Sequence, residues 1–209
     1  MAGARAPPRP DQGIAIENLP LFPLRAVLFP GGRLPLRIFE ARYMDMARAC
    51  LREDAPFGVC AIREGAEVGA PATPYEVGTL ARIVQWDMPQ LGVLQVVAHG
   101  ERRFRIRSRQ VQRDGLARAA VELLGEESDA PVAPAGKRCV RLLERLIERE
   151  PDLFAEPHRL DSSAWVSARL AELLPLELGA KQALLELDAG AARLEEISAL
   201  LRADAPPES

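Results

Sequence analysis

The sequence of 209 residues holds few of the side chains on which metal and redox sites depend. Its two histidines, His99 and His158, lie far apart and outside any cluster with the spacing of metal ligands. No Cys-x-x-Cys pair occurs, and we expect reduced, buried thiols at the three widely spaced cysteines, Cys50, Cys60 and Cys139. This scarcity predicts that the protein has no metal site and needs no cofactor.

Lysine is almost absent, since Lys137 and Lys181 are the only two in the chain. A phosphate-binding loop needs a glycine-rich run that ends in Gly-Lys followed by Ser or Thr. The nearest fragment, residues 179–182, lacks both the run and the hydroxyl. Neither lysine suggests a Ser–Lys peptidase dyad, and the sequence offers no catalytic trio built on a histidine. We therefore predict that the chain is not an enzyme.

Long apolar runs are also missing, and none approaches the roughly 20 residues that a membrane-spanning helix needs. Residues 1–13, MAGARAPPRPDQG, lack the apolar core of a secretory signal and are predicted to be a disordered tail. Residues 204–209 are predicted to be a second tail. The formal net charge of −3 is small for a chain of this length. These features predict a soluble, cytoplasmic protein that does not contact membranes.

The most distinctive stretch is residues 19–43, which reads LPLFPLRAVLFPGGRLPLRIFEARY. Prolines punctuate three short apolar runs, and because proline cannot donate to a sheet ladder, we expect short, sharply bent strands. Gly31 and Gly32 predict a turn between the second and third runs. From Glu40 to Arg52 the apolar residues recur with a helical period, which predicts an amphipathic helix inserted among the strands.

The remainder divides into a strand-rich part, a linker and a helical part. Strands are predicted at residues 57–62, 77–86, 93–98, 102–111 and 116–123, which favours a small barrel or sandwich over residues 14–124. Residues 125–136, GEESDAPVAPAG, have the composition of a linker. Residues 137–203 predict about four helices, one of which starts near Ser162.

Three segments carry a family resemblance that spans almost the whole chain. The run at residues 19–43 resembles the opening of the Lon-protease N-terminal, substrate-binding domain family. Matching segments follow in order at 77–79 with 100–104, and at 173–175 with 181–186 and 193–194. The resemblance implies an α+β chain, with an N-terminal PUA-like small β-barrel that holds one inserted helix and a C-terminal α-helical bundle.

The same resemblance implies a function for a chain that lacks the ATPase and protease domains of a full-length Lon protease. It implies a non-enzymatic module that binds unfolded or partly folded polypeptides, as an adaptor or substrate-binding protein in proteolysis and protein quality control. Self-association is a further expectation if an apolar surface is exposed.

A candidate polypeptide-binding site lies at the predicted turn after residue 86. Turn tips are usually polar, but this one carries Trp86, Met88 and Leu91. Methionine adapts to varied apolar partners, so the turn predicts a contact point for unfolded chains. The alternative is that Met88 and Leu91 fold back onto the barrel or the helices.

A nucleic-acid site is the alternative hypothesis. Period-2 spacing predicts one basic face on a strand, where arginine forks could hold RNA phosphates: Arg103, Arg105, Arg107 and Arg109. Three observations argue against RNA: the mildly acidic chain, the near absence of aromatic residues for base stacking in this segment, and the need of any half-buried strand for a polar outer face.

Overall fold

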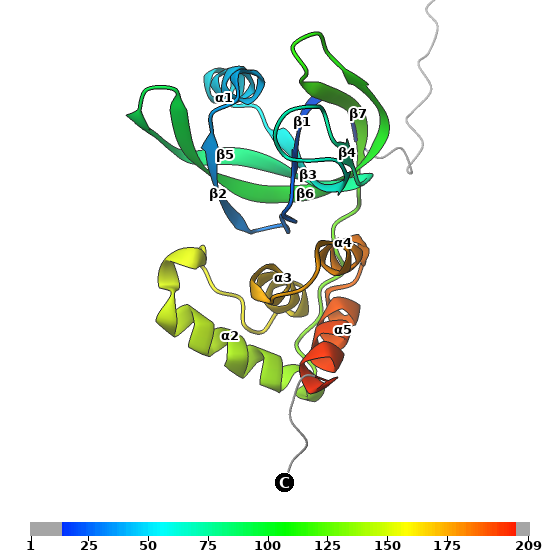
Figure 1. Ribbon diagram of the computed structural model, residues 1–209. Coiled ribbons are helices and arrows are strands. Elements are labelled where there is room, and N and C mark those ends of the chain that lie inside the picture. The colour runs from blue at the N-terminus through cyan, green and yellow to red at the C-terminus, as the bar shows by residue number, and fades with distance from the viewer. Residues whose placement is uncertain (1–13, 204–209) are drawn as a thin grey trace, which may run out of the picture.

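The computed structural model describes residues 14–203, so the predicted tails at 1–13 and 204–209 lie outside the described part. Seven strands form one sheet (Figure 1). They are β1 (Ala15–Leu24), β2 (Arg33–Ile38), β3 (Phe57–Glu64), β4 (Thr73–Pro74), β5 (Val77–Gln90), β6 (Val93–Val111) and β7 (Ala117–Leu123).

The strands pair in the order β1-β7-β6-β5-β3-β4, and β2 pairs with β6. A further parallel pairing joins β1 to β3, with Leu21 opposite Gly58. Strand β1 is therefore paired with β7 on one side and with β3 on the other. Gly58 is required at this crowded point, because a Cβ there would lie 2.7 Å from the ring of Phe104. Close packing inside the sheet therefore restricts this position to glycine.

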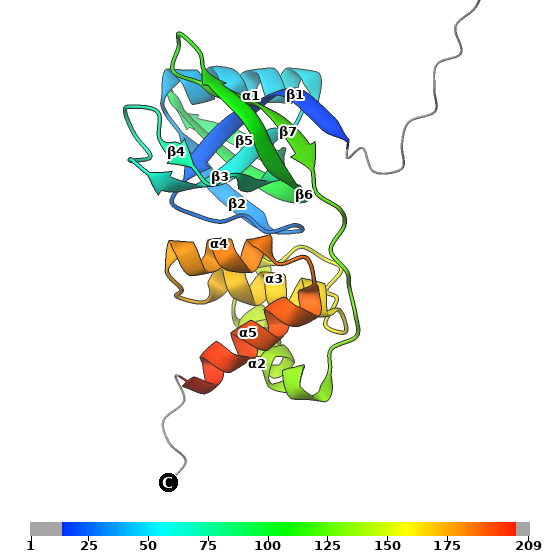
Figure 2. The same cartoon turned by 90° about the vertical axis from the view of Figure 1, so that its right-hand side faces the viewer.

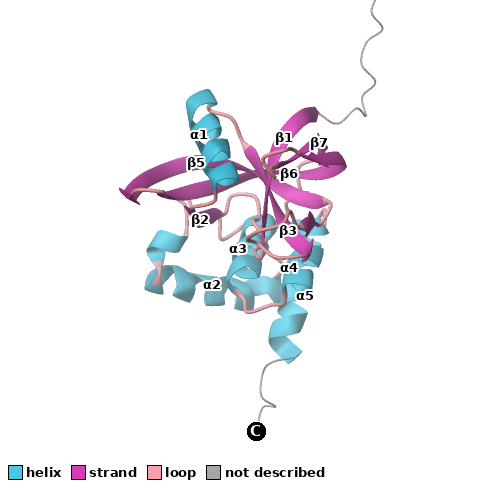
Figure 3. Cartoon of the chain, turned by 45° about the horizontal axis from the view of Figure 1, so that its top comes forward, coloured by secondary structure: helices cyan, strands magenta, loops and turns pink. Residues whose placement is uncertain are grey.

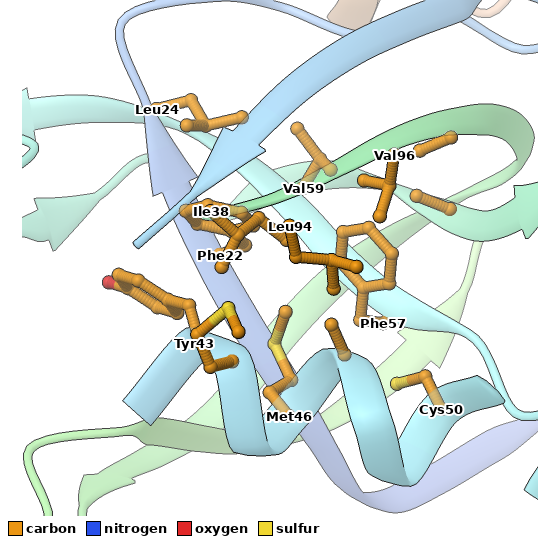
Figure 4. Packing of buried hydrophobic residues seen from close by; sticks show 14 of the residues in the cluster. Phe22, Leu24, Ile38, Tyr43, Met46, Cys50, Phe57, Val59, Leu94 and Val96 are labelled. Carbon is orange, nitrogen blue, oxygen red and sulfur yellow. The ribbon is translucent and has the colours of Figure 1, made fainter. Parts of the chain in front are cut away.

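Helix α1 (Ala41–Glu53) covers one side of the sheet, at the top of Figure 1. Its apolar stripe of Tyr43, Met46 and Cys50 is buried, and Tyr43 stacks on Phe22 with ring centroids 4.2 Å apart (Figure 4). The helical period at residues 40–52 predicted this helix to within one residue at each end. The three cysteines are free and buried, as expected.

The remaining helices lie on the opposite side of the sheet from α1 in both Figure 1 and Figure 2. They are α2 (Lys137–Arg149), α3 (Ser163–Leu173), α4 (Leu178–Glu186) and α5 (Gly190–Ala203), with short 3-10 turns η1 (Pro134–Gly136) and η2 (Pro151–Leu153) beside α2. Their shared core includes Leu143, Leu170, Leu185 and Ile197, which are fully buried. None of the helices in residues 14–203 has the length and apolar character to cross a bilayer.

The coarse prediction of a strand-rich part followed by helices agrees with the observed sheet and five α-helices in residues 14–203. Three details of the strand prediction are wrong. The apolar run at residues 26–29 forms no strand, and β1 continues through both of its prolines instead of breaking into short pieces. The expected strands at 93–98 and 102–111 are one strand, β6, and β5 extends through the expected turn to Gln90. Gly100 does not interrupt β6; it allows the close approach of the loop that holds Leu28 and Phe29. The closed PUA-like barrel and the helical bundle remain proposals.

The predicted start of α3 allows a direct test. Ser162 caps this helix, because its hydroxyl accepts a hydrogen bond of 3.0 Å from the Trp165 N–H. The change Ser162→Ala should lower the free energy of unfolding by about 1 kcal/mol, since the Trp165 N–H would lose its partner. Urea titration measures this loss, and Ser162→Thr, which keeps the hydroxyl, should retain most of the stability. Equal stability of the alanine variant and the wild type would contradict a role for the cap.

Candidate functional site

The candidate site lies on a three-stranded extension of the sheet, which we call the arm. It consists of β2, residues 82–90 of β5 and residues 93–99 of β6, with β6 between the other two strands. Figure 3 shows the β5 end of the arm projecting past α1. Leu36, Val96 and Trp86 stand opposite one another across the arm and therefore share one of its faces.

The apolar residues predicted at the turn are exposed at the tip of the arm. Trp86 is 61% exposed, Met88 38% and Leu91 94%. Leu91 and Gly92 form the turn itself, where Gly92 has a φ of +82°. The alternative prediction, that Met88 and Leu91 pack back onto the rest of the protein, is wrong for Leu91, and Met88 keeps about a third of its surface exposed.

Two clefts border the arm, and Gln85 lines both of them. One, of about 600 Å³, is lined by the central residues of all three strands, 35–37, 85–87 and 95–97. The other, of about 610 Å³, lies between the arm and the segment that follows α2, and its lining includes Arg33, Gln85, His99 and Phe154. Arg33 spans this second cleft, since its guanidinium donates to the Asp152 carbonyl and to the Gln85 amide oxygen, each at 3.5 Å.

The two histidines, distant in sequence, both line the second cleft. Partial burial lowers the pKa of His99, and the positive charge of Arg169 lowers it further. The ring of His158 stands edge-on to Phe154, with centroids 6.3 Å apart. Within residues 14–203, no group of three histidine, cysteine or acidic side chains lies close enough together to hold a metal ion.

The predicted basic face on β6 is wrong at its first residue, because Arg103 is buried. Its guanidinium donates to the carbonyls of Leu185 and Leu187, at 2.8 and 2.9 Å, and pairs with Asp188 at 2.9 Å. Only 3% of Arg103 is exposed. This side chain connects the sheet to the helical part and cannot contact an RNA phosphate in this arrangement.

A β-bulge separates the other arginines of the predicted face. The pairing of β6 with β7 shifts by one residue between Ile106 and Ser108. Alternation is interrupted there, so Arg109 does not share a face with Arg105. Arg107 is exposed but forms an ion pair with Glu122. The four side chains therefore do not form the continuous surface that regular alternation predicted.

Sequence reasoning missed the polar junction between the sheet and the helices. Arg193 on α5 is completely buried and donates to both carboxylate oxygens of Glu127, at 2.7 and 2.5 Å, and to the Ser167 hydroxyl at 3.0 Å. The Arg103 guanidinium approaches the same carboxylate at 3.6 Å. Residues 125–136 were predicted to be a linker, but this segment is anchored through Glu127. The segment Arg193-Leu194 was matched to the family, but nothing in its local sequence indicates a partner 66 positions earlier.

A second polar contact holds α3 against the loop between β1 and β2. The Glu172 carboxylate accepts from the Phe29 N–H at 3.3 Å and pairs with Arg169 at 3.1 Å, while Arg169 donates to the Pro30 carbonyl at 2.9 Å. Burial, which outweighs the attraction of Arg169, raises the pKa of Glu172 to about 7. A Cβ at Gly32 would overlap Glu172 Oε1, so a side chain at that position would displace the carboxylate from this contact.

Comparison with known proteins gives consistent matches. A family model described as the ATP-dependent protease La (LON) substrate-binding domain matches residues 18–203. A crystal structure of a Lon N-terminal domain protein from Xanthomonas campestris is 39% identical, with a TM-score of 0.73, and the match covers 91% of this chain and 100% of that one.

Curated relatives are longer than this chain. Lon protease 2 of Myxococcus xanthus is 30% identical over 194 residues, which cover 88% of this chain and 23% of that protein. Protein cereblon of Danio rerio is 29% identical over 141 residues, 66% of this chain and 31% of that protein. The chain thus spans less than a third of either relative.

Proposed function

Because the chain belongs to the LON substrate-binding domain family, we propose that it is a non-enzymatic module that binds unfolded or partly folded polypeptides. The observation that supports this most directly is the exposure of Trp86, Met88 and Leu91 at the tip of the arm. In this proposal the module acts as an adaptor or substrate-binding protein in proteolysis, located in the cytoplasm, and any cleavage is carried out by another protein.

The clefts beside the tip suggest how such a module would work. Residues 14–124, proposed as a PUA-like barrel, and 137–203, proposed as a helical bundle joined to it by residues 125–136, both contribute to the cleft that contains His99 and His158. An extended client would bury its apolar side chains on the tip and continue along the cleft. Burial of apolar area is tolerant of sequence, and an exposed methionine adapts to different side chains. The same exposed surface would support self-association at high concentration.

Titration of a fluorescently labelled, denatured casein-like polypeptide tests the proposal. The double variant Met88→Asp, Leu91→Asp should weaken binding by about tenfold, because each carboxylate would lose water on contact with an apolar client. The matched control is Val68→Asp, Val111→Asp, which changes two other exposed apolar residues outside the arm and should bind like the wild type. Equal weakening of both double variants would exclude the tip as the site.

Salt separates this proposal from the nucleic-acid alternative. Casein binding driven by apolar burial should survive high salt, whereas phosphate contacts weaken steeply as salt rises. A labelled single-stranded RNA should therefore be titrated in parallel, with Arg105→Ala and Arg107→Ala as variants that leave the buried Arg103 in place. The polypeptide-binding proposal would be overturned if the protein binds RNA with an affinity that falls steeply as salt rises and does not bind casein.

A further inference from the structure

The two outer edges of the arm differ in what they offer to another strand. The Gly100 N–H donates to the Gly32 carbonyl at 2.9 Å, and the Gly31 N–H donates to the Gly100 carbonyl at 2.8 Å, so the main chain of Gly100 faces β2. Main-chain groups alternate in direction along an antiparallel pair. Pro35, paired with Val97, therefore points its main chain toward the open edge. Proline has no N–H, so the edge of β2 cannot complete a ladder.

The edge of β5 is open at its centre. The same alternation turns Gln95 and Val97 of β6 toward β5, where they pair with Asp87 and Gln85. Trp86, between those two partners, therefore directs its N–H and carbonyl away from β6. The pairing of β5 with its other neighbour, β3, ends before the arm begins. Within the described residues, no other strand lies on this side of Trp86 to pair with it.

Side chains and charge at this edge indicate the kind of strand that would fit. Val84, Trp86 and Met88 expose large apolar surfaces along the same strand. The Asp87 carboxylate accepts from the Met88 N–H at 2.8 Å, which occupies the next donor along the edge, and Pro89 after it has no N–H. The ladder that this edge can offer is therefore short and is centred on Trp86. Asp87 forms no ion pair within the described residues and leaves a negative charge beside the apolar side chains. A short apolar segment with a basic residue at one end complements this edge.

We propose that an extended polypeptide segment of this kind binds by adding as a strand to β5, centred on Trp86. Main-chain hydrogen bonds would supply affinity that does not depend on client sequence, and the exposed apolar side chains would contact alternate residues of the segment. The proposal rests on polypeptide binding as the function and specifies how the client is held.

The test uses a short labelled peptide of alternating valine and threonine with a lysine at each end. Two further versions carry N-methyl groups on alternate residues, one in each register, so that each edge of the peptide is blocked in turn. The intact protein should bind the unmethylated peptide, and at least one methylated version should bind about tenfold more weakly, because its blocked edge cannot pair with β5. Equal binding of all three peptides would overturn strand addition.

A pair of variants separates main-chain from side-chain recognition. Trp86→Thr removes the indole but keeps the N–H, whereas Trp86→Pro removes both, at a position whose N–H does not serve the ladder with β6. Peptide binding should be about tenfold weaker in the proline variant than in the threonine variant. Circular dichroism tests whether both variants are folded. If the proline variant is not folded, the N-methyl series on the wild-type protein decides whether the main chain of the peptide is recognised.

The outcomes distinguish the mode of binding from the function itself. The wild-type protein could bind casein and yet bind all three peptides equally, with the two Trp86 variants binding peptide equally as well. That result would overturn strand addition and leave the proposed function intact. If the wild-type protein binds neither casein nor the unmethylated peptide, both proposals are overturned.

Discussion

Replacing Arg193 by methionine is expected to lower the free energy of unfolding by about 3 kcal/mol. The arginine is completely buried, and its guanidinium supplies two hydrogen bonds to Glu127, one to the Ser167 hydroxyl and one to the Ala164 carbonyl. Methionine fills a similar volume but leaves the carboxylate in the same desolvated place, with only the more distant Arg103 as a partner. Urea unfolding followed by circular dichroism at neutral pH measures the loss.

Arg202 provides the matched control, since it lies on the same helix, is exposed, and donates only to the Ser198 hydroxyl among the described residues. Arg202→Met should change stability by less than about 0.5 kcal/mol. A double variant, Arg193→Met with Glu127→Leu, should recover much of the loss, because replacing both members of a buried pair with apolar residues removes the unpaired charge. A single variant as stable as the control would show that the junction contributes nothing to folding.

Local patterns in the sequence predict local structure well in this protein. The helical period after Glu40 predicts α1 because its stripe, from Tyr43 to Cys50, depends only on neighbours along the chain. Ser162 caps α3 for the same reason, since its partner is three residues away. Gly31 and Gly32 predict the turn before β2, where the Gly32 N–H donates to the Phe29 carbonyl at 3.0 Å, whereas the prolines at 20 and 23 lie inside β1 and do not end it.

The incorrect predictions depend on contacts that no local pattern encodes. Regular alternation placed Arg103 and Arg109 on one outer face, but Arg103 is buried by carbonyls from the end of α4, and a bulge after Ile106 separates Arg109 from the rest. The arm was missed as a unit because it is assembled from three strands of which one, β2, lies far from the others in sequence. Its exposed tip was recognised only from the unusual apolar composition of the turn.

The contribution of Glu172 to the free energy of unfolding should fall as pH rises from about 4.5 to about 7. Burial raises the pKa of this carboxyl from its ordinary value of 4.5 to about 7 in the folded protein. Between these values the folded state binds more protons than the unfolded state, so stability is lost as pH rises. The groups that face the carboxylate are Arg169 on α3, Lys181 on α4, Arg193 on α5 and the Phe29 N–H. Their attraction reduces the cost of ionisation without removing it.

Comparison of the wild type with Glu172→Gln isolates this contribution, because glutamine has the same shape and does not titrate. The difference in unfolding free energy, wild type minus variant, should fall by about 2 kcal/mol between pH 5 and pH 8. His99 acts in the opposite direction in the wild type, since its lowered pKa makes stability rise with pH, but it is present in both proteins and cancels. Glu195→Gln, an exposed change on α5, should reproduce the wild-type curve. A difference that stays nearly constant from pH 5 to pH 8 would mean that the ion pair with Arg169 outweighs burial, and that the carboxyl is ionised throughout this range.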